Sequence, residues 1–555
     1  MRLIEIRLLE GPNVYRLEPV VKVEVAIGRR RTWYGQRVPP RHALVRLGAA
    51  VPRRHWPPAV EAIGAWARRL RTEHGEGTTG LRVHRSSDPG HWILTWPWSG
   101  ADRAIAIAEA AVALGERNVA HERGTKPSPA GARLLESWRA RIEGAKTQPP
   151  ALIRDADRRV PIVSITGTNG KSTVTRLITH ILLLAGRRVG TTTSDGVLVD
   201  ERMVDPGDWT GPGGAAQVLG RDDIDVAVLE TARGGILLRG LGYESNDASV
   251  LTNVTSDHLD LQGIHTLPEL AEVKSVVCRV TKPSGWVVLN GDDPFVAAVA
   301  GRVEANVALF SLRERSAAVR RHLSAGRRAY LLRDSTLVEV EGDRTSVIAQ
   351  VGDVPIAIGG LARHNIANAL AASGAARGLG ATLEQVRHGL TDFRPSSERS
   401  PGRLNIFRVG AKVVVVDFAH NEAGVGAILD VADGIASGTA TGGGGRRKAP
   451  ITMIIGTAGD RPDDTLRGIG RLAGERAQRI AIKETLKYLR GRTRESMVGE
   501  LLAGVRAARR STSDIPVYES ETEALRTELT LNGTSEGVTR ARVIVLMCHE
   551  EREEV

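Results

Sequence analysis

A glycine-rich turn carries the residues whose chemistry is clearest. The segment Ser164 to Thr173 reads SITGTNGKST, and it joins an apolar run typical of a strand to a segment with helical periodicity. Glycines let the backbone wrap a phosphate chain, and successive N–H groups at a helix N-terminus stabilise its charge. A lysine there reaches the terminal phosphates, and a hydroxyl can ligate Mg²⁺. The pattern predicts a site for ATP and Mg²⁺ whose residues are Gly167, Thr168, Asn169, Gly170, Lys171, Ser172 and Thr173.

This turn departs from the general P-loop pattern at one position. The general pattern has a glycine five residues before Gly170, where this chain has Ile165. The fit is therefore to a shorter variant, GTNGKS. A chance Gly-Lys-Ser turn is the alternative, and the position between a strand and a helix argues against it.

Three further polar residues follow along the chain. Glu230 ends an apolar run, and the carboxyl ends of parallel strands form the edge where open α/β sheets bind ligands. Phosphoryl transfer to a carboxylate gathers several negative charges, so a hard oxygen ligand for Mg²⁺ such as Glu230 is expected near ATP. His258 lies in TNVTSDHLD and Lys274 in LAEVKSVV. Taken alone, Lys274 fits a surface salt-bridge lysine on a helix better than a ligand.

Two later segments add amides, an arginine and a second carboxylate. Residues 364–368 read HNIAN, SPGRLNIF contains an arginine, and VVVDFAHN follows an apolar strand. Asparagines can simply cap or pair within helices, and an Asp and a His after a strand can form an ordinary helix cap. Their occurrence together with the glycine-rich turn favours one shared site. The candidates are Asn365, Asn368, Arg403, Asp417 and His420.

In order and spacing these motifs resemble the Mur ligase superfamily, whose central domain carries GTNGK[ST], a strand-end Glu, a TN…DHLD segment and a downstream Lys. The resemblance implies that Lys274 is carbamylated and joins the metal ligands. The implied Mg²⁺ ligands are Ser172, Glu230, His258 and Lys274.

The resemblance also assigns the later segments. The HNxxN stretch implies that Asn365 and Asn368 approach the adenine, and Arg403 and Asp417 match the hinge arginine and the DxAHN motif by which a third domain closes over ATP. Catalytic roles are implied for Lys171, His258, Lys274, Arg403, Asp417 and His420. Lys483, Arg490 and Arg492 are candidate contacts for a substrate carboxylate, with solvated surface charge as the alternative.

Other segments narrow the resemblance to the cyanophycin synthetase family. LETARGGILLRGLGY, GDWTGPGGA and IKETLKYLRGR resemble its Mur-like half, and LLEGPN resembles the opening of its N-terminal domain. In that family the Mur-like half joins arginine to the side-chain carboxylate of aspartate on a growing polymer. That family places an ATP-grasp ligase domain between these two parts, whereas this chain has only a short linker near residues 144–157.

The resemblance implies an ADP-forming ligase that joins a carboxylate to an amino acid amine through an acyl-phosphate. The acceptor would be an acidic peptide or polymer, and a separate ATP-grasp ligase is a further candidate partner. Two alternatives stay open, namely a non-catalytic or ATP-binding accessory subunit of such an ATP-grasp enzyme, and a P-loop NTPase acting on nucleic acid. Oligomeric state is left open.

The elements that must position these residues predict three α/β domains. Residues 1–148 form a small α/β domain with strands near 3–9, 20–27 and 91–96. Residues 155–396 alternate apolar strands with helices, which favours a parallel sheet with crossover helices and a central P-loop domain of the Mur ligase type. Residues 397–555 predict a Rossmann-like C-terminal domain, in which the glycine-rich run 437–450 is a flexible surface loop.

Composition limits the cellular setting. No run reaches the roughly 18 apolar residues that a membrane span needs, and the opening MRLIEIRLLEGPN carries acidic residues where a signal peptide would be uniformly apolar. We therefore expect a cytoplasmic protein without a membrane partner. Cys278 and Cys548 lie far apart, so neither a disulfide framework nor a zinc site is predicted.

The net charge of +12 is concentrated at one end of the chain. Residues 1–150 contain 25 Lys or Arg against 14 Asp or Glu. This basic part could attract an acidic polymer, and the alternative is an arginine-rich genome bias on a solvated face. Aromatic residues make up only 4% of the chain and no nucleic-acid motif is recognisable, so no nucleic-acid partner is expected.

Overall fold

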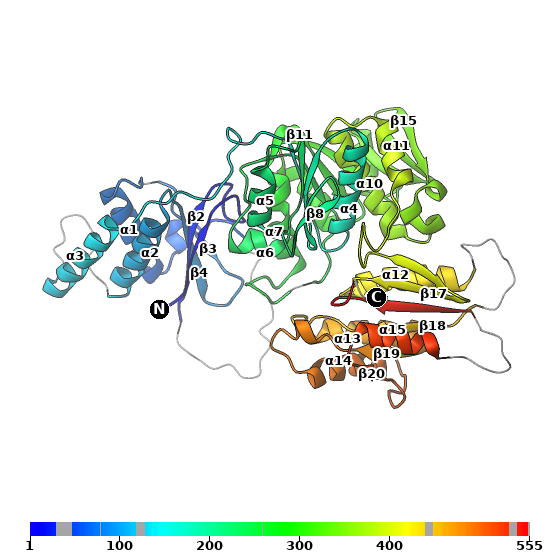
Figure 1. The fold of residues 1–555 in the computed structure, drawn as a ribbon. Helices are drawn as coiled ribbons and strands as arrows, with labels where there is room; N and C mark the ends of the chain where they lie inside the picture. The colour runs from blue at the N-terminus through cyan, green and yellow to red at the C-terminus, as the bar shows by residue number, and fades with distance from the viewer. Residues whose placement is uncertain are drawn as a thin grey trace.

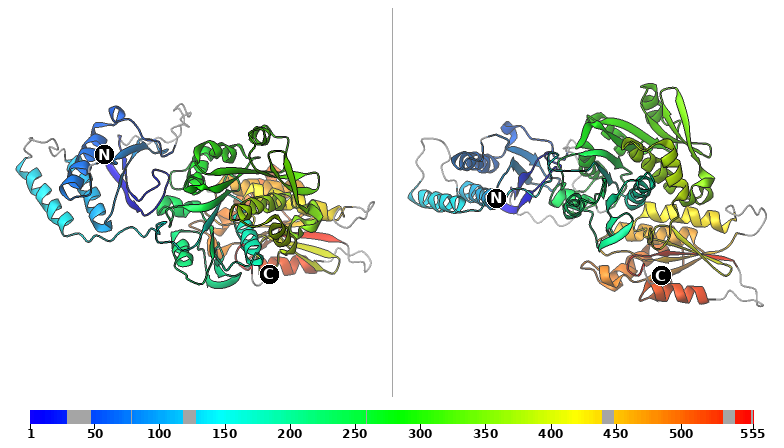
Figure 2. Two further views of the ribbon diagram at one scale, coloured as in Figure 1. Left: turned by 90° about the horizontal axis from the view of Figure 1, so that it is seen from above. Right: turned by 45° about the horizontal axis from the view of Figure 1, so that its top comes forward.

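Three sheets divide the chain into three lobes. The computed structural model describes residues 1–28, 47–77, 79–117, 128–257, 259–438, 448–531, 541–552 and 555. The N-terminal lobe lies at one end of the central lobe, and the C-terminal lobe packs beside the central lobe away from it (Figures 1 and 2). Most of the predicted loop at 437–450 falls outside the described residues. Within the described part, no helix is long and apolar enough to cross a bilayer.

The N-terminal lobe is a four-stranded antiparallel sheet in the order β1-β2-β4-β3 with helices on one face. Alternation in β2 points Val21, Val23 and Val25 at those helices, where Trp66 and Ile107 are fully buried. The predicted α/β character of this lobe is confirmed. Its elements are β1 (Arg2–Leu9), β2 (Val20–Ala26), β3 (Arg82–Arg85), β4 (His91–Pro97), α1 (Pro58–Glu73), α2 (Ala101–Glu116) and α3 (Pro129–Glu143).

The central sheet has the order β15-β14-β13-β12-β11-β10-β5-β9-β6-β7-β8. The strands from β13 to β6 run parallel, whereas β7, β8, β14 and β15 pair antiparallel. The strands are β5 (Ile162–Thr166), β6 (Val189–Thr192), β7 (Gly196–Val199), β8 (Arg202–Pro206), β9 (Val226–Glu230), β10 (Asn246–Leu251), β11 (Thr281–Asn290), β12 (Asn306–Ser311), β13 (Ala329–Arg333), β14 (Thr336–Glu341) and β15 (Arg344–Gln350).

The central sheet is thus mixed, because both of its edges add antiparallel strands to the predicted parallel sheet. Connections of two residues join β7 to β8, β13 to β14 and β14 to β15, and such short turns permit only antiparallel pairing. Asp200, Glu201 and Asp334 take up positive φ in these turns. The parallel interior, which carries the glycine-rich turn, agrees with the prediction.

Helices cover both faces of the central sheet. One face is packed by α4 (Lys171–Leu184), α10 (Arg363–Gly378) and α11 (Leu383–Asp392). The other is packed by α5 (Pro212–Leu219), α6 (Arg233–Leu238), α7 (Leu267–Arg279), α8 (Pro294–Ala297) and α9 (Ala317–Ser324). Short 3₁₀ turns occur at η1 (Arg53–His55), η2 (Ala298–Arg302), η3 (Val351–Asp353), η4 (Pro355–Gly360) and η6 (Leu486–Tyr488).

The C-terminal sheet has the order β16-β17-β21-β18-β19-β20, and it is parallel except for β16 at one edge. Three helices pack on one face and α15 on the other, as predicted for a Rossmann-like lobe. The elements are β16 (Asn405–Val409), β17 (Lys412–Asp417), β18 (Ile451–Ile455), β19 (Arg479–Lys483), β20 (Val517–Tyr518), β21 (Arg542–Met547), α12 (Glu422–Ala436), α13 (Asp463–Arg476), α14 (Arg494–Ala507) and α15 (Glu521–Thr530).

Main-chain hydrogen bonds join the first two lobes. Glu10 N donates to Arg239 O at 2.7 Å, and Leu241 N donates to Pro12 O at 2.9 Å. A second contact lies between the β3–β4 turn and the segment before α7, where Asp88 Oδ1 is 3.0 Å from His265 Nε2.

Candidate active site

The glycine-rich turn lies between β5 and α4 and is tightly enclosed. Gly167 has a φ of 149° and Gly170 a φ of 87°, which other residues rarely adopt. A Cβ atom at Gly170 would lie 2.4 Å from Asn368 Oδ1, and one at Gly167 would lie 1.8 Å from Thr252 Oγ1. Both positions therefore require glycine for space as well as for conformation.

The TN segment after β10 holds this turn in place. Asn169 N donates to Asn253 Oδ1 at 2.9 Å, and Asn253 Nδ2 donates back to Asn169 O at 2.9 Å. Thr252 Oγ1 also donates to Asn169 O, at 2.7 Å. These contacts leave Lys171 and Ser172 at the start of α4, beside a cavity that both residues line.

Glu230 ends β9 inside the molecule, with 3% of its surface exposed. Burial raises the pKa of its carboxyl, against the opposing charges of Lys171 and Arg403. Its Oε2 atom is buried and accepts no hydrogen bond from any residue that the structure describes. A buried acceptor without a donor is costly, and a divalent cation would satisfy it, so Glu230 fits the predicted Mg²⁺ site.

Lys274 projects from α7 and is also buried, with 4% of its surface exposed. Its Nζ donates to Gly167 O at 2.7 Å. Burial, reinforced by the charge of Lys171, lowers the pKa of Lys274 well below its usual range. The alternative that Lys274 is a surface salt-bridge lysine is wrong.

The two asparagines of α10 face the same turn. Asn368 Nδ2 donates to Asn365 Oδ1 at 3.0 Å, and Asn365 Nδ2 donates to Ile356 O at 3.1 Å. Both side chains line the cavity. The two asparagines therefore support each other at the wall of the cavity.

The third lobe contributes the far wall of the cavity. Arg403 Nη2 lies 3.2 Å from both Ser172 Oγ and Ser194 Oγ, and its guanidinium stacks 4.6 Å from the centre of the Phe418 ring. Asp417 Oδ2 accepts from Leu404 N at 2.8 Å, and burial raises the pKa of this carboxyl to about 6.

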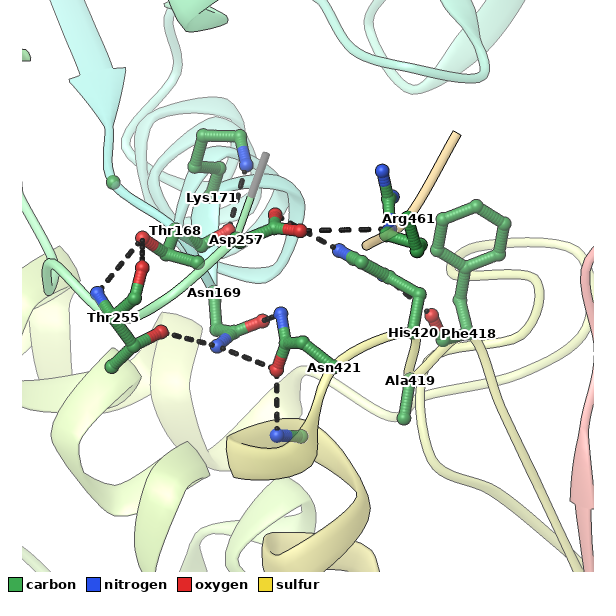
Figure 3. Close-up of polar contacts among 12 residues, drawn as sticks. Thr168, Asn169, Lys171, Thr255, Asp257, Phe418, Ala419, His420, Asn421 and Arg461 are labelled. Atoms are coloured by element: carbon green, nitrogen blue, oxygen red, sulfur yellow. Dashed lines mark hydrogen bonds and ion pairs between the residues drawn. The ribbon is translucent and has the colours of Figure 1, made fainter. Parts of the chain in front are cut away.

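Polar contacts bridge the central and third lobes (Figure 3). Asn421 Nδ2 donates to Asn169 Oδ1 at 3.0 Å, and Asn169 Nδ2 donates back to Asn421 Oδ1 at 3.3 Å. Asp257 lies between two residues of the third lobe, 3.4 Å from His420 Nε2 and 3.5 Å from Arg461 Nε. The structure therefore has the third lobe closed over the glycine-rich turn.

These elements enclose a cavity of about 710 Å³. The residues predicted to bind ATP or Mg²⁺ or to act in catalysis line it, apart from His258, which lies outside the described residues. The lining residues among those predictions are Gly167, Thr168, Asn169, Gly170, Lys171, Ser172, Thr173, Glu230, Lys274, Asn365, Asn368, Arg403, Asp417 and His420.

Asp257 and Arg461 are among the lining residues that were not singled out from the sequence. Asp257 precedes His258 within the DHLD motif, so the motif itself was the available signal. Arg461 lies in the segment GTAGDRPDD, where nothing in the local sequence marks it as a site residue. Only the closed arrangement of the lobes brings the two together.

The three proposed carboxylate contacts of the third lobe do not line this cavity. Lys483 is buried and paired with Glu521. Arg492 is paired with Asp463, and Arg490 stacks 5.4 Å from the centre of the Tyr488 ring.

Comparison with known proteins agrees with this geometry. The family model described as "Mur ligase middle domain" matches residues 165–376, a range that contains the glycine-rich turn, Glu230, Lys274 and both asparagines of α10. Residues 165–376 are thus similar to a Mur ligase middle domain.

Longer relatives match beyond this domain. The chain is 42% identical over 347 residues to the cyanophycin synthetase of a Nostoc species. This match covers 62% of this chain and 37% of that protein. It is 38% identical over 371 residues to the cyanophycin synthetase of Crocosphaera subtropica, and this match covers 67% of this chain and 41% of that protein. The matched part of the chain thus spans about two fifths of the length of these curated relatives.

A solved structure has a similar fold over much of the chain. A Mycobacterium tuberculosis folylpolyglutamate synthase complexed with ADP and AMPPCP matches 70% of this chain and 89% of that chain, with a TM-score of 0.50 and 19% sequence identity. At this sequence identity the match shows similarity of fold alone.

Proposed function

We propose that this chain is an ATP-dependent ligase that forms an amide between a carboxylate and an amino acid amine. The observation that carries the proposal is the single cavity in which Lys171, Glu230 and Lys274 of the Mur ligase domain meet Arg403 and His420 of the third lobe. A phosphate-binding turn, a carboxylate suited to Mg²⁺ and a second lobe closed over both are what acyl-phosphate chemistry requires.

The proposed reaction has two steps. A carboxylate oxygen of the acceptor attacks the γ-phosphorus of ATP, ADP leaves, and an acyl-phosphate forms. The amine then attacks the acyl carbon, and the tetrahedral intermediate expels inorganic phosphate to give the amide. Lys171 and Arg403 are positioned to offset the charge that develops on the transferred phosphoryl group.

Ser172, Glu230 and a carbamate of Lys274 would hold Mg²⁺, with His258 added by the DHLD motif. The metal would neutralise phosphate charge and bring ATP and the acceptor carboxylate together. A neutral Lys274 amine can attack CO₂ and lose a proton to give the carbamate. The lowered pKa of Lys274 supports this, because only the uncharged amine is nucleophilic.

Closure of the third lobe protects the acyl-phosphate. Water in the cavity would hydrolyse it and waste ATP, and contacts such as Asn169 with Asn421 close the lobe over the turn. We assign this role to residues 397–555, with residues 155–396 as the nucleotide-binding domain.

We further propose an acidic peptide or polymer as the acceptor, with the aspartate side chain and arginine as the first acid and amine to test. The cyanophycin synthetase relatives and the excess of basic residues in 1–150 support this choice. Residues 1–148 would then dock the acceptor, since they contact segments next to α6 and α7 on the cavity side of the central lobe. A separate ATP-grasp ligase is the proposed source of the acidic backbone.

The test is a screen for ADP release with Asp-containing peptides and single amino acids, with amide formation followed by mass spectrometry. ADP release that requires both an acid and an amine, and that stops in Lys171→Ala, is the expected result. ATP binding without turnover for every pair would instead favour an accessory subunit of another ligase.

A further inference from the structure

A buried charge network lies in the third lobe behind the wall of the cavity. Lys483 at the end of β19 is fully buried, and its Nζ meets three acceptors, which match the three hydrogens of an ammonium. Those acceptors are a carboxylate oxygen of Glu521, Thr485 Oγ1 at 3.2 Å and His549 Nδ1 at 3.0 Å. Nothing in this arrangement leaves Lys483 available to a substrate.

The network fixes the protonation of His549. Because Lys483 donates to Nδ1, the proton of the neutral ring lies on Nε2, which donates to Ala419 O at 3.1 Å. Burial, together with the charge of Lys483, lowers the pKa of His549 well below its usual range, which keeps the ring neutral. His549 also packs 5.0 Å from the ring of Phe418. The ring therefore ties the core of the lobe to the segment between Asp417 and His420.

The same network fixes the segment after β21. One Glu521 carboxylate accepts backbone N–H groups of His549, Glu550 and Glu551, at 2.6, 3.1 and 2.9 Å. Three successive N–H groups on one carboxylate determine the path of the main chain. Arg552 follows directly.

Arg552 crosses to the central lobe. It pairs with Asp195 in the turn between β6 and β7, where Arg176 Nη2 also lies 2.7 Å from that carboxylate. Desolvation of Asp195 is outweighed by the charges of Arg403, Arg552 and Arg176, which lower its pKa to about 2. The Arg552 guanidinium also stacks 5.0 Å from the Phe418 ring, and Arg403 stacks on that ring too.

We infer that Lys483 is a positioning residue, which acts through Glu521 and His549 to hold residues 417–420 and Arg552 in the closed arrangement. Only the predicted kinetic effect of this inference rests on the proposed ligase function. Lys483 would touch neither ATP nor acceptor, yet its loss would loosen one wall of the cavity and one contact between lobes at the same time.

The first test replaces His549, which leaves the Lys483–Glu521 pair intact. His549→Leu should lower kcat by between about 10-fold and 10²-fold, the scale of loss expected when reacting groups are misplaced, with an unchanged Kd for ATP. It should also raise the ADP released per amide formed, because an open wall admits water. His549→Gln, which can still donate near the Nε2 position, should restore most of kcat.

Arg552→Gln is a second variant on a partly exposed side chain, and it tests the crossing contact without altering the buried core. It should lower kcat and raise the ratio of ADP to amide in the same direction. Normal kcat and a normal ratio in both His549→Leu and Arg552→Gln would overturn the inference.

A readout independent of turnover separates this inference from the proposed function. Hydrogen exchange of residues 417–421 should accelerate in His549→Leu, while exchange in β18 and β21 stays as in the unaltered protein. If no acid–amine pair supports ADP release, the proposed function fails and the exchange result still decides the positioning role. Unchanged exchange in 417–421 would refute that role.

Discussion

At the scale of single residues, the clearest prediction concerns the substitution of Lys171. Lys171→Ala should lower kcat by roughly 10²-fold or more, because a preorganised charge opposite the transferred phosphoryl group is lost. Steady-state ADP release measures this, with Lys146→Ala as a control at an exposed lysine in the linker. Near-normal kcat in Lys171→Ala would show that the glycine-rich turn is not the nucleotide site.

Lys274 is expected to act as a carbamate. Removal of CO₂ and bicarbonate should reduce ADP release by the unaltered protein, and added bicarbonate should restore it. Lys274→Met should be inactive, because it keeps the apolar stem but cannot form the carbamate, and Lys274→Ala should regain some activity with short carboxylates. Full activity of Lys274→Met would show that the cavity needs no ligand from this residue.

Individual site residues differ in how far the sequence reveals them. Lys171 and Glu230 were predicted from their local sequence, whereas Lys274 was predicted only from the resemblance to Mur ligases, and all three line one cavity. The contact of Asp257 with Arg461 was not predicted, because it exists only when two lobes that are distant in sequence close together. The burial of Lys274 likewise could not be predicted from the sequence of its helix, because Gly167 O and the cavity wall around Lys274 come from other elements.

At the scale of elements, the glycine-rich turn permits a matched comparison. Gly170 and Gly186 flank α4 with φ of 87° and 82°, but a Cβ meets Asn368 at the first and nothing within 4 Å at the second. Gly170→Ala should raise the Kd for ATP by about 10-fold or more, because the turn must move off Asn368. Gly186→Ala should cost only about 1 kcal/mol of stability from its backbone conformation. Calorimetric titration with ATP and thermal melting compare the two, and equal Kd values would contradict the tight fit.

The elements themselves were predicted where apolar runs and periodicity are strong. β5, β9 and β10 are short apolar strands in the parallel interior, and their order follows from crossover helices. The antiparallel edges were missed because β8 and β15 expose most of their residues and therefore lack an apolar signature. The edge hairpins depend on turn conformations such as the positive φ of Asp334, which composition does not reveal.

At the scale of the whole molecule, the basic N-terminal lobe should determine the affinity for long acceptors. Changing the exposed residues Arg2, Arg82 and Arg133 to Ser should raise KM for a long acidic acceptor while kcat and KM for a short one stay the same. Higher salt should mimic the variant, because exposed charges are screened within about 10 Å at 0.1 M ionic strength.

The control for that variant changes Arg320, Arg506 and Arg526, which are exposed in the other two lobes, so that net charge falls equally. If both triple variants behave alike, general charge and not the N-terminal lobe governs acceptor binding. If only kcat falls in the first variant, the lobe belongs to the catalytic architecture instead.

The main-chain joint between the first two lobes determines which parts of the molecule can move. Backbone hydrogen bonds from Glu10 and to Pro12 tie the N-terminal lobe to the central lobe, whereas the third lobe meets the central lobe through side chains such as Asn169 and Asn421. On the proposed function, we therefore expect opening for nucleotide exchange to displace the third lobe alone. On the proposed function, a polymer anchored on the N-terminal lobe keeps its register with the glycine-rich turn while ADP leaves and ATP enters. We therefore expect such a molecule to be processive, adding successive residues to one chain before it releases that chain.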